Sequence, residues 1–287
     1  MIVSRPLAAQ AATGSDSGKL AKFVARAGRV HQHLDWHLPS AWLGHRPFYF
    51  AMEGRRVAGV FAAPPDPPDA AWVRVLGIAD GVPAGDVLRA VWPAARRDLE
   101  ADGVHLVAAL AVDEWVGAAL EGVGFLKVNE VVVLARRGGI TTAVKQPASY
   151  SVRRFGPADL AGVSAVDLEA FDPPWQNSPE ALRLGLAQSA WATVAETGHP
   201  PRPIGFQIST PSDSGGHLAR LAVLPEYRGQ GIATALVADA VAYFDRHDAS
   251  QVTVNTQQDN YASLAIYSRL GFEPTGERYG IWQMRLG

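Results

Sequence analysis

The chain carries the same order of hydrophobic patterns twice. In the C-terminal half, alternating apolar positions predict strands, and apolar positions three and four residues apart predict helices. The second half thus reads as strand 217–223, helix 233–244, strand 251–256, helix 260–270, the corner Gly271-Phe272 and strand 281–286. The first half repeats this order as strand 71–78, helix 84–101, strand 104–112, helix 113–122, the corner Gly124-Phe125 and strand 131–136.

The two Gly-Phe corners lie 147 residues apart, and the helices before them keep about the same offset. A repeat of this kind indicates a tandem duplication. The stretch 135–155 mixes basic residues, a Gly pair and a Pro, which is typical of a domain boundary. We therefore expect an α/β (α+β) protein with a flexible N-terminus (1–19), a first domain (20–140) and a second domain (148–287), each built as a mixed sheet flanked by helices.

Composition narrows the possible functions. The 287 residues carry a formal net charge of -2, which provides no basic field for binding nucleic acid. There is no cysteine, which excludes disulfides, thiolate metal sites and a cysteine acyl intermediate. Residues 1–19 are too weakly apolar for a signal peptide and too few to span a bilayer. We expect a cytoplasmic protein without a membrane or nucleic-acid partner.

The stretch 224–236 lies between a predicted strand and a predicted helix and contains Arg228, Gly229 and Gly231. A helix N-terminus offers backbone N–H groups without intrahelical partners, and glycines let the chain approach a ligand closely. The pattern therefore suits a pyrophosphate, and an ordinary surface turn is the alternative. A Walker loop would need Lys-Ser/Thr after the glycines, and a dinucleotide fold would need a third glycine where Thr234 stands.

The two copies differ at this turn. Under the offset of the corners, Arg228 falls near Asp80, Gly231 near Pro83 and Tyr267 on Leu120. The first copy has lost the donors of the turn and gained an acidic residue. We expect an active second half and a degenerate first half that does not hold an anion.

Across 218–272 the sequence resembles the GNAT superfamily of acyl-CoA-dependent N-acyltransferases. The family's pyrophosphate signature, Arg/Gln-x-x-Gly-x-Gly/Ala, is matched by Arg228, Gly231 and Ala233. Its second signature is matched by Asn260, Ser263, Tyr267, Gly271 and Phe272, with Ile266 in place of the usual Leu. The resemblance implies two GNAT-like domains with mostly antiparallel sheets, and tandem members with one degenerate copy are known in this superfamily.

The resemblance also implies acetyl-CoA as co-substrate, with no metal. By analogy with the family, the backbone of Leu221 and Val223 would pair with the pantetheine arm, and the amides from Gly229 through Gln230, Gly231 and Ala233 to Thr234 would hold the pyrophosphate. Asn260 would contact the coenzyme arm or only cap its helix.

Acyl transfer to an amine needs a proton donor and a proton acceptor, and the resemblance suggests a residue for the first role. Tyr267 corresponds to the family's phenol beside the coenzyme sulfur and is our candidate general acid, with packing as the alternative. Many members carry a glutamate where this chain has His217, and an imidazole could deprotonate an ammonium through water. A structural histidine at a strand start is the alternative. Without cysteine, we expect direct attack in a ternary complex.

The acceptor pocket is expected in the segment 167–182, where Glu169, Asp172 and Trp175 could receive a cationic or aromatic amine. Turn chemistry around Asp172 and core packing of Trp175 are the alternatives. His33 and His37 stand at helical spacing but lack a third ligand motif, so no metal is expected. The function expected is N-acetylation of a small-molecule or peptide amine by a monomer or homodimer, and the alternative is a non-catalytic acyl-CoA-binding module.

Overall fold

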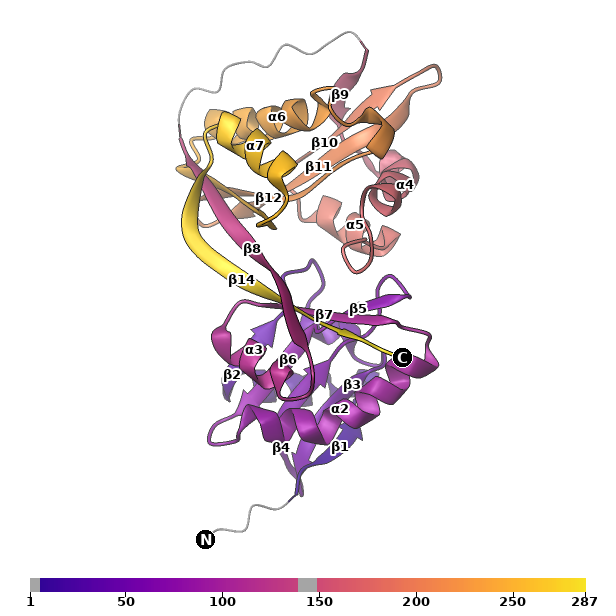
Figure 1. Ribbon diagram of the computed structural model, residues 1–287, viewed down its shortest axis with the longest axis vertical. Coiled ribbons are helices and arrows are strands. Elements are labelled where there is room, and N and C mark those ends of the chain that lie inside the picture. Colours follow the sequence, from indigo (N-terminus) through magenta and orange to yellow (C-terminus); the bar gives the residue numbers. More distant parts are fainter. Residues whose placement is uncertain (1–5, 139–148) are drawn as a thin grey trace. The chain divides into compact units, whose positions relative to one another are not determined.

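The computed structural model describes residues 6–138 and 149–287, which form two compact units (Figure 1). Unit 1 comprises the chain up to Glu130 together with Tyr279–Gly287, and unit 2 comprises Val131–Arg278. Both units mix a sheet with flanking helices, as expected from the sequence.

Unit 1 begins with a sheet in the strand order β1-β3-β4-β6-β2, and β5 pairs in parallel with β7 at the end of a second sheet, in which β7 also pairs with residues 280–285. Its elements, in chain order, are β1 (Ala8–Ala11), α1 (Ser17–Val24), β2 (Ala27–Gln32), β3 (Phe48–Glu53), β4 (Arg56–Ala62), β5 (Ala70–Trp72), β6 (Val75–Ala79), α2 (Ala84–Ala101), β7 (Leu106–Ala111), α3 (Glu114–Glu121) and β8 (Leu126–Arg137).

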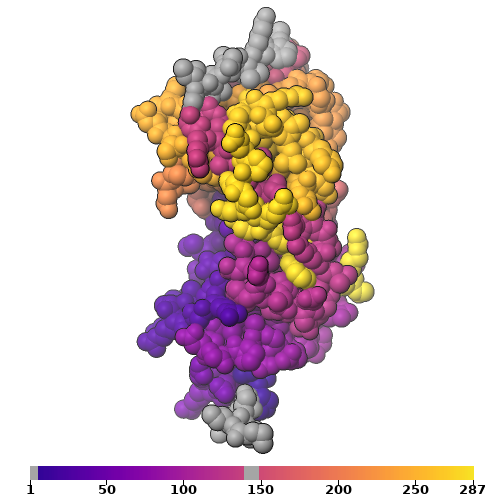
Figure 2. Space-filling view, turned by 60° about the vertical axis from the view of Figure 1, so that its left-hand side comes forward, coloured from indigo at the N-terminus to yellow at the C-terminus, as the bar shows by residue number. Residues whose placement is uncertain are grey.

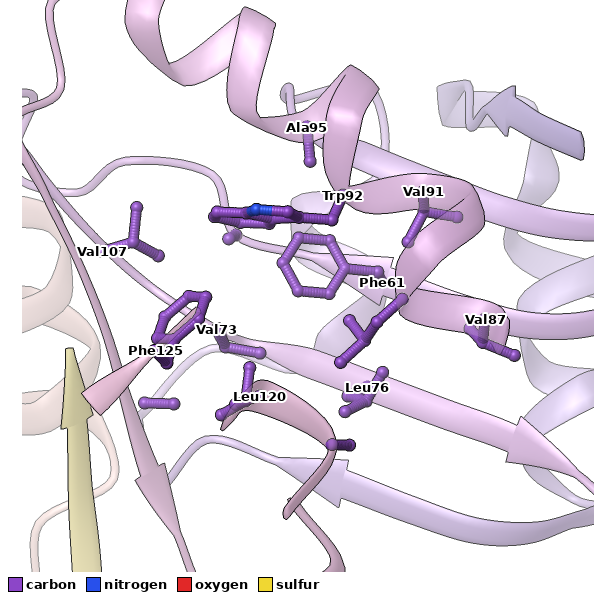
Figure 3. Close-up of a cluster of buried hydrophobic side chains, with 14 of the residues drawn as sticks. Phe61, Val73, Leu76, Val87, Val91, Trp92, Ala95, Val107, Leu120 and Phe125 are labelled. Atoms are coloured by element: carbon purple, nitrogen blue, oxygen red, sulfur yellow. The ribbon is translucent and has the colours of Figure 1, made fainter. Parts of the chain in front are cut away.

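Both faces of the five-stranded sheet are buried. Along β3, Phe48 and Phe50 enter a cluster with Leu20 and Phe23 of α1, whereas Tyr49 and Ala51 enter a second cluster with residues of α2. Successive side chains of a strand point to opposite faces, so a strand with large apolar residues at every position needs a cover on each side. Figure 3 shows the second cluster, in which Phe61, Trp92 and the corner residue Phe125 meet, with ring centroids 5.9 Å and 5.2 Å from that of Trp92.

Unit 2 is a mostly antiparallel sheet in which part of β8 pairs with β13, followed by β12, β11, β10 and β9. Its elements, in chain order, are β9 (Ser151–Arg154), α4 (Leu160–Ala170), α5 (Pro179–Ala187), β10 (Trp191–Thr197), β11 (Arg202–Ser212), β12 (Gly215–Val223), α6 (Ile232–Arg246), β13 (Gln251–Gln257), α7 (Tyr261–Arg269) and β14 (Glu273–Arg285).

Helices α4 and α6 cover opposite faces of this sheet. Leu221 packs with the cluster that contains Val237 and Val241 of α6, while the preceding residue, Arg220, pairs with Asp167 of α4. Alternation along the strand therefore places the two helices on different sides. Figure 2 shows that the segment from α7 to the start of β14, coloured yellow, lies on the surface of unit 2.

The last strand of each repeat pairs with a strand of the other repeat. Residues 131–137 of β8 pair with β13 in unit 2, and residues 280–285 of β14 pair with β7 in unit 1. The units thus divide after Glu130 and again before Tyr279. We expected domains 20–140 and 148–287 with a boundary in the stretch 135–155, of which residues 139–148 lie outside the described residues. The hydrophobic pattern of a strand fixes which face it buries and leaves open which sheet it joins.

Two other details differ from expectation. Residues 1–19 are predicted to be a flexible terminus, but Ala8–Ala11 pairs antiparallel with β3 and α1 begins at Ser17. The pairing of β1 depends on backbone hydrogen bonds, for which three alanines and a glutamine give no hydrophobic signal. The strand predicted at 71–78 is interrupted between Trp72 and Val75, which separates β5 from β6. In the described part of the chain, no helix is long and apolar enough to cross a membrane.

Candidate acyl-coenzyme site

The site begins where β12 separates from β13. The parallel pairing of these strands covers Gly215–Leu218, whereas β12 stays paired with β11 as far as Val223. A register shift in the β11 pairing leaves Ala219 as an extra residue between Leu218 and Arg220. Such a bulge bends a strand and ends regular pairing, and here it marks the point of separation.

The separated edge carries backbone groups that bond no strand among the described residues, and one of them, the carbonyl of Val223, accepts a hydrogen bond from Nε of Arg228. The N–H of Leu224 donates to the carbonyl of Ile204 on the β11 side, at 2.9 Å. Because backbone groups alternate along a strand, those of Leu221 and Val223 point to the other edge, which has no strand partner in the part of the chain that the structure describes. The geometry therefore presents these two residues as a template for an extended ligand.

The turn after β12 combines two glycines with the start of α6. Eight residues separate Val223 from Ile232, and two of them, Gly229 and Gly231, have φ values of +77° and +82°. Gly231 is the N-cap of α6 and supplies no capping side chain, so the first-turn amides, including those of Ala233 and Thr234, have neither an intrahelical acceptor nor a cap. Gln230 is exposed and its side chain donates to the carbonyl of Glu226. Unpaired amides at the positive end of a fifteen-residue helix fit a diphosphate.

Arg228 lies in this turn, but its guanidinium is engaged in holding the backbone. Nε donates to the carbonyl of Val223 at 3.3 Å, and Nη2 donates to the carbonyl of Ala170 at 3.0 Å. A guanidinium has five N–H donors, so these two bonds leave others for an anion. Arg228 thus connects the free edge of β12 to the end of α4.

Asn260 is the N-cap of α7, and its Oδ1 accepts from the N–H of Ser263 at 3.2 Å. The capping interpretation of this residue is therefore realised in the structure. A contact between Asn260 and a coenzyme arm is not tested by this geometry.

Tyr267 is buried, with 3% of its surface exposed, and belongs to the apolar cluster that also contains Leu218 of β12 and Phe272. Burial raises the pKa of its phenol well above the ordinary value of 10, and a hydrogen bond with Ser263 acts in the opposite direction. The phenol keeps its proton throughout the neutral range.

His217 lies at the start of the region where β12 separates. Its Nδ1 is 2.9 Å from Oγ1 of Thr253 on β13, and the Thr253 hydroxyl in turn donates to the carbonyl of Gly216 at 3.4 Å. With its hydrogen committed there, the hydroxyl accepts from Nδ1–H, which places the lone pair of the imidazole on Nε2. Burial lowers the pKa of His217, so the neutral form dominates at neutral pH.

The residues predicted for the acceptor pocket lie in and beside the loop between α4 and α5. Glu169 and Asp172 are exposed, whereas Trp175 is half-buried and its carbonyl accepts from Nη2 of Arg220 at 2.7 Å. The turn interpretation of this loop is also present, because the N–H of Trp175 donates to the carbonyl of Asp172 and Ser178 caps α5.

Sequence reasoning missed the pair Asp167 and Arg220 behind this loop. Asp167 is fully buried, and its carboxylate accepts hydrogen bonds from Nε and Nη2 of Arg220, at 2.7 Å and 2.8 Å. The available signal was a single arginine within an apolar strand pattern, since a buried charge requires a partner.

The equivalent edge in unit 1 is covered. In unit 1, Ala70–Trp72 pairs in parallel with β7, just as Gly215–His217 pairs in parallel with β13 in unit 2. Trp72 therefore corresponds to His217. Counting on from there, Leu76 and Ile78 correspond to Leu221 and Val223. In unit 1 these two counterparts pair with β2, through His31 and Arg29.

The turn of unit 1 is also shorter. Four residues separate Ala79 from Ala84, and the N-cap of α2 is Pro83, which has no N–H. The structure therefore agrees with the expectation that Gly231 and Pro83 correspond. In addition, it reveals β2 as a cover that the sequence comparison did not find.

His33 and His37 lie next to β2, in a segment where the N–H of His37 bonds to Asp35 and His33 stacks on Trp72 with a centroid distance of 4.6 Å. They are not on a helix, so the helical spacing assumed from the sequence is wrong. Among residues 6–138 and 149–287, no group of three or more His, Cys, Asp or Glu side chains could hold a metal ion.

Comparison with known proteins identifies the family. Residues 161–272 match the model of the acetyltransferase (GNAT) family. An uncharacterized N-acetyltransferase of Methanocaldococcus jannaschii is 30% identical over 128 residues, which cover 42% of this chain and 76% of that protein. N-alpha-acetyltransferase 30 of Schizosaccharomyces pombe is 42% identical over 57 residues, 20% of this chain and 38% of the relative's length.

Two solved structures resemble the whole fold. A GCN5-related N-acetyltransferase from Sphaerobacter thermophilus aligns with a TM-score of 0.63 and 17% identity, over 98% of this chain and 96% of that one. A tandem GNAT protein from the clavulanic acid biosynthesis pathway aligns with a TM-score of 0.62 and 19% identity, over 98% of each chain. Given the family match and the archaeal relative, the chain belongs to the GNAT acetyltransferase family, a family of acyl-transferring enzymes.

Proposed function

We propose that unit 2 transfers an acetyl group from acetyl-CoA to an amine. The observation that carries this proposal is the free edge of β12 at Leu221 and Val223, which leads directly into the unpaired amides around Gly231. An extended arm that ends in a diphosphate would find backbone donors and acceptors at this edge and unpaired amides at the helix N-terminus beyond it.

Acetyl-CoA would supply an activated thioester and a thiolate leaving group. The amides of Gly229–Thr234 would hold the diphosphate, and the backbone of Leu221 and Val223 would orient the arm. The N–H of Val223 is also the candidate donor that polarises the thioester carbonyl. The assignment to unit 2 rather than unit 1 is supported by β2, whose residues His31 and Arg29 pair with the residues of β6 that correspond to Leu221 and Val223.

Proton transfer is assigned to His217 and Tyr267. An alkylammonium must lose a proton before its nitrogen can attack, and a neutral imidazole with its lone pair on Nε2 can accept that proton directly or through water. A C–N bond then forms as the C–S bond breaks, the nitrogen releases its second proton to water, and the thiolate takes a proton. The buried phenol of Tyr267, which is protonated at neutral pH, is the candidate donor.

The acceptor is an amine whose ammonium form would be attracted to Glu169 and Asp172, which are exposed beside the half-buried Trp175. Similar proteins include N-alpha-acetyltransferases, a putative ribosomal protein bS18-alanine N-acetyltransferase of Bacillus subtilis and a peptidyl-lysine N-acetyltransferase of Salmonella typhimurium. These names make peptide N-termini and lysine side chains the first acceptors to test, together with small amines.

The experiment combines calorimetry with thiol release. Acetyl-CoA should bind the full chain, and at least one amine of the panel should release free thiol in a protein-dependent reaction. Binding without turnover for every amine would favour a non-catalytic acyl-CoA-binding module. No binding of any acyl-CoA would refute both functions.

A further inference from the structure

A buried ion pair joins β12 to α4 at the point where β12 leaves β13. The Arg220 side chain is 12% exposed and the Asp167 side chain 0%, and the two share paired hydrogen bonds of 2.7 Å and 2.8 Å. A bidentate arginine–carboxylate contact that is shielded from water fixes the relative orientation of both groups. The pair therefore acts as a rigid joint between the strand and the helix.

The acceptor-side loop is attached to this joint. Nη2 of Arg220 donates to the carbonyl of Trp175 at 2.7 Å, and Oδ1 of Asp167 accepts from the N–H of Asn177 at 2.7 Å. The guanidinium also lies over the ring of Phe171, with its central carbon 3.7 Å from the ring centroid. Three residues across the loop are thus positioned by the same two side chains.

The coenzyme side is attached to the joint through the backbone. Arg220 is the first residue after the bulge at Ala219, and the next residue, Leu221, presents its backbone groups at the free edge. Any rotation of Arg220 would therefore move the edge and the loop together. Arg228 adds a second connection, because it bonds both Val223 and Ala170.

We propose that Arg220, acting through Asp167, is a positioning residue that sets the acceptor loop against the coenzyme edge of unit 2. This inference rests on the transferase function proposed above. Arg220 transfers no proton, and because Asp167 neutralises its charge it does not serve as a binding site for an acidic acceptor. Its contribution is geometric, and small displacements of reacting groups reduce rates strongly.

The test compares Arg220→Lys with Arg136→Lys in the full chain. Arg136 is also buried in unit 2 and forms a bidentate pair with Asp245, at 2.8 Å and 3.2 Å, on a different helix, α6. Lysine keeps the positive charge but lacks the planar fork, so both variants lose a comparable contact. For each, the measurements are the thermal midpoint, the Kd of acetyl-CoA, hydrogen exchange of residues 171–178, and kcat and KM for an amine that the wild type acetylates.

We expect Arg220→Lys to lower kcat/KM for the amine about 10-fold or more while the Kd of acetyl-CoA changes less than about 3-fold. The N–H of Asn177 should exchange faster in this variant, and Arg136→Lys should leave both the exchange and the amine kinetics unchanged. Equal kinetic losses in the two variants, or an unchanged kcat/KM in Arg220→Lys, would overturn the proposal.

Asp167→Asn serves as a second variant of nearly the same volume. Should both Arg220→Lys and Asp167→Asn fail to fold by circular dichroism, the pair would be a stability element only and the positioning role would be refuted. Failure of the proposed function has a different signature, namely a wild-type protein that acetylates no amine. In that case, hydrogen exchange of residues 171–178 alone decides whether Arg220 holds the loop.

Discussion

Nδ1 of His217 lies 2.9 Å from Oγ1 of Thr253, across the parallel pairing of β12 and β13. This contact favours the tautomer with the proton on Nδ1, because the threonine hydroxyl donates to the carbonyl of Gly216 at 3.4 Å. It also joins the two strands one pair before their last pair, Leu218 and Val254, so the candidate base lies beside the start of the coenzyme edge.

Replacing His217 with Gln should lower kcat about 100-fold, in the range typical of a lost general base, with little change in the Kd of acetyl-CoA. Because burial lowers the pKa of His217, the acid limb of the kcat profile should have its midpoint below pH 6.5 in the wild type and disappear in the variant. Rates measured from pH 5 to 9 would check this. A variant with wild-type kcat would return His217 to a structural role.

Thr253→Val should give a smaller loss, about 10-fold in kcat, because it removes the acceptor for Nδ1–H and leaves the imidazole in place. The apo protein should keep its thermal midpoint to within a few degrees. If Thr253→Val affects kcat more than His217→Gln, the hydroxyl rather than the imidazole would be the important group.

Tyr267→Phe should reduce kcat more than it weakens binding of acetyl-CoA, because the change removes one proton donor from an otherwise apolar cluster. Burial raises the pKa of Tyr267, so the wild type should show no loss of activity from phenol ionisation below pH 10. Steady-state kinetics and calorimetry with both proteins test this. An unchanged kcat would remove Tyr267 from catalysis.

The chain should bind one equivalent of acetyl-CoA, because β2 covers the edge of β6 that corresponds to the free edge of β12. Gly231→Asp should abolish this binding, since a carboxylate at the N-cap would occupy the first-turn amides and repel a diphosphate. Calorimetry gives both the stoichiometry and the loss. Ligand-induced stabilisation in thermal unfolding should disappear in parallel.

The matched control is Gly81→Asp in unit 1. Gly81 is exposed, lies between β6 and α2 and also has a positive φ, +74°, so this substitution adds the same charge and similar backbone strain. Binding should stay at one equivalent. Two equivalents in the wild type, or loss of binding in Gly81→Asp, would show that unit 1 takes part.

Unit 1 should lose stability on mild acidification. Burial lowers the pKa of His31 to about 4 from the ordinary 6.5, so the unfolded chain takes up this proton at a higher pH than the folded chain. The stabilisation is present above pH 6.5 and is lost as the pH falls from 6.5 to 4, with a full value of about 3 kcal/mol. Burial lowers the pKa of His33 as well, and this adds to the loss.

Urea unfolding of the wild type and of His31→Leu at pH 7 and pH 5 measures the effect on the free energy of unfolding. The variant should show a smaller decrease between the two pH values, because leucine does not titrate. His199→Gln, at an exposed histidine of unit 2, should keep the wild-type dependence. Equal decreases in the wild type and His31→Leu would contradict the assignment.

Several parts of the architecture were predictable from local pattern. The helix expected at 84–101 matches α2, and both Gly-Phe corners end with a buried phenylalanine, Phe125 and Phe272. These features succeed because a helix and a tight corner are specified by residues that are neighbours in sequence. The turn at Gly229 and Gly231 was predictable for the same reason, since its positive φ values favour glycine.

The contributions of distant residues were not predictable in this way. Nothing in the sequence around 131–137 or 280–285 indicates that these strands pair with β13 and β7. Likewise, Arg220 and Asp167 are separated along the chain, and their pairing depends on α4 crossing the face of β12.

By itself the sequence determined the repeat, the glycine turn before the helix of the second repeat and the residue types that acyl transfer requires. Each of these is encoded by periodicity or by a short motif. Only the tertiary structure decided that β2 covers the edge of β6 while the edge of β12 stays free. Backbone hydrogen bonds between strands are available to any residue except proline, so the choice of partner is set by the packing of the whole unit and leaves no local trace in the chain.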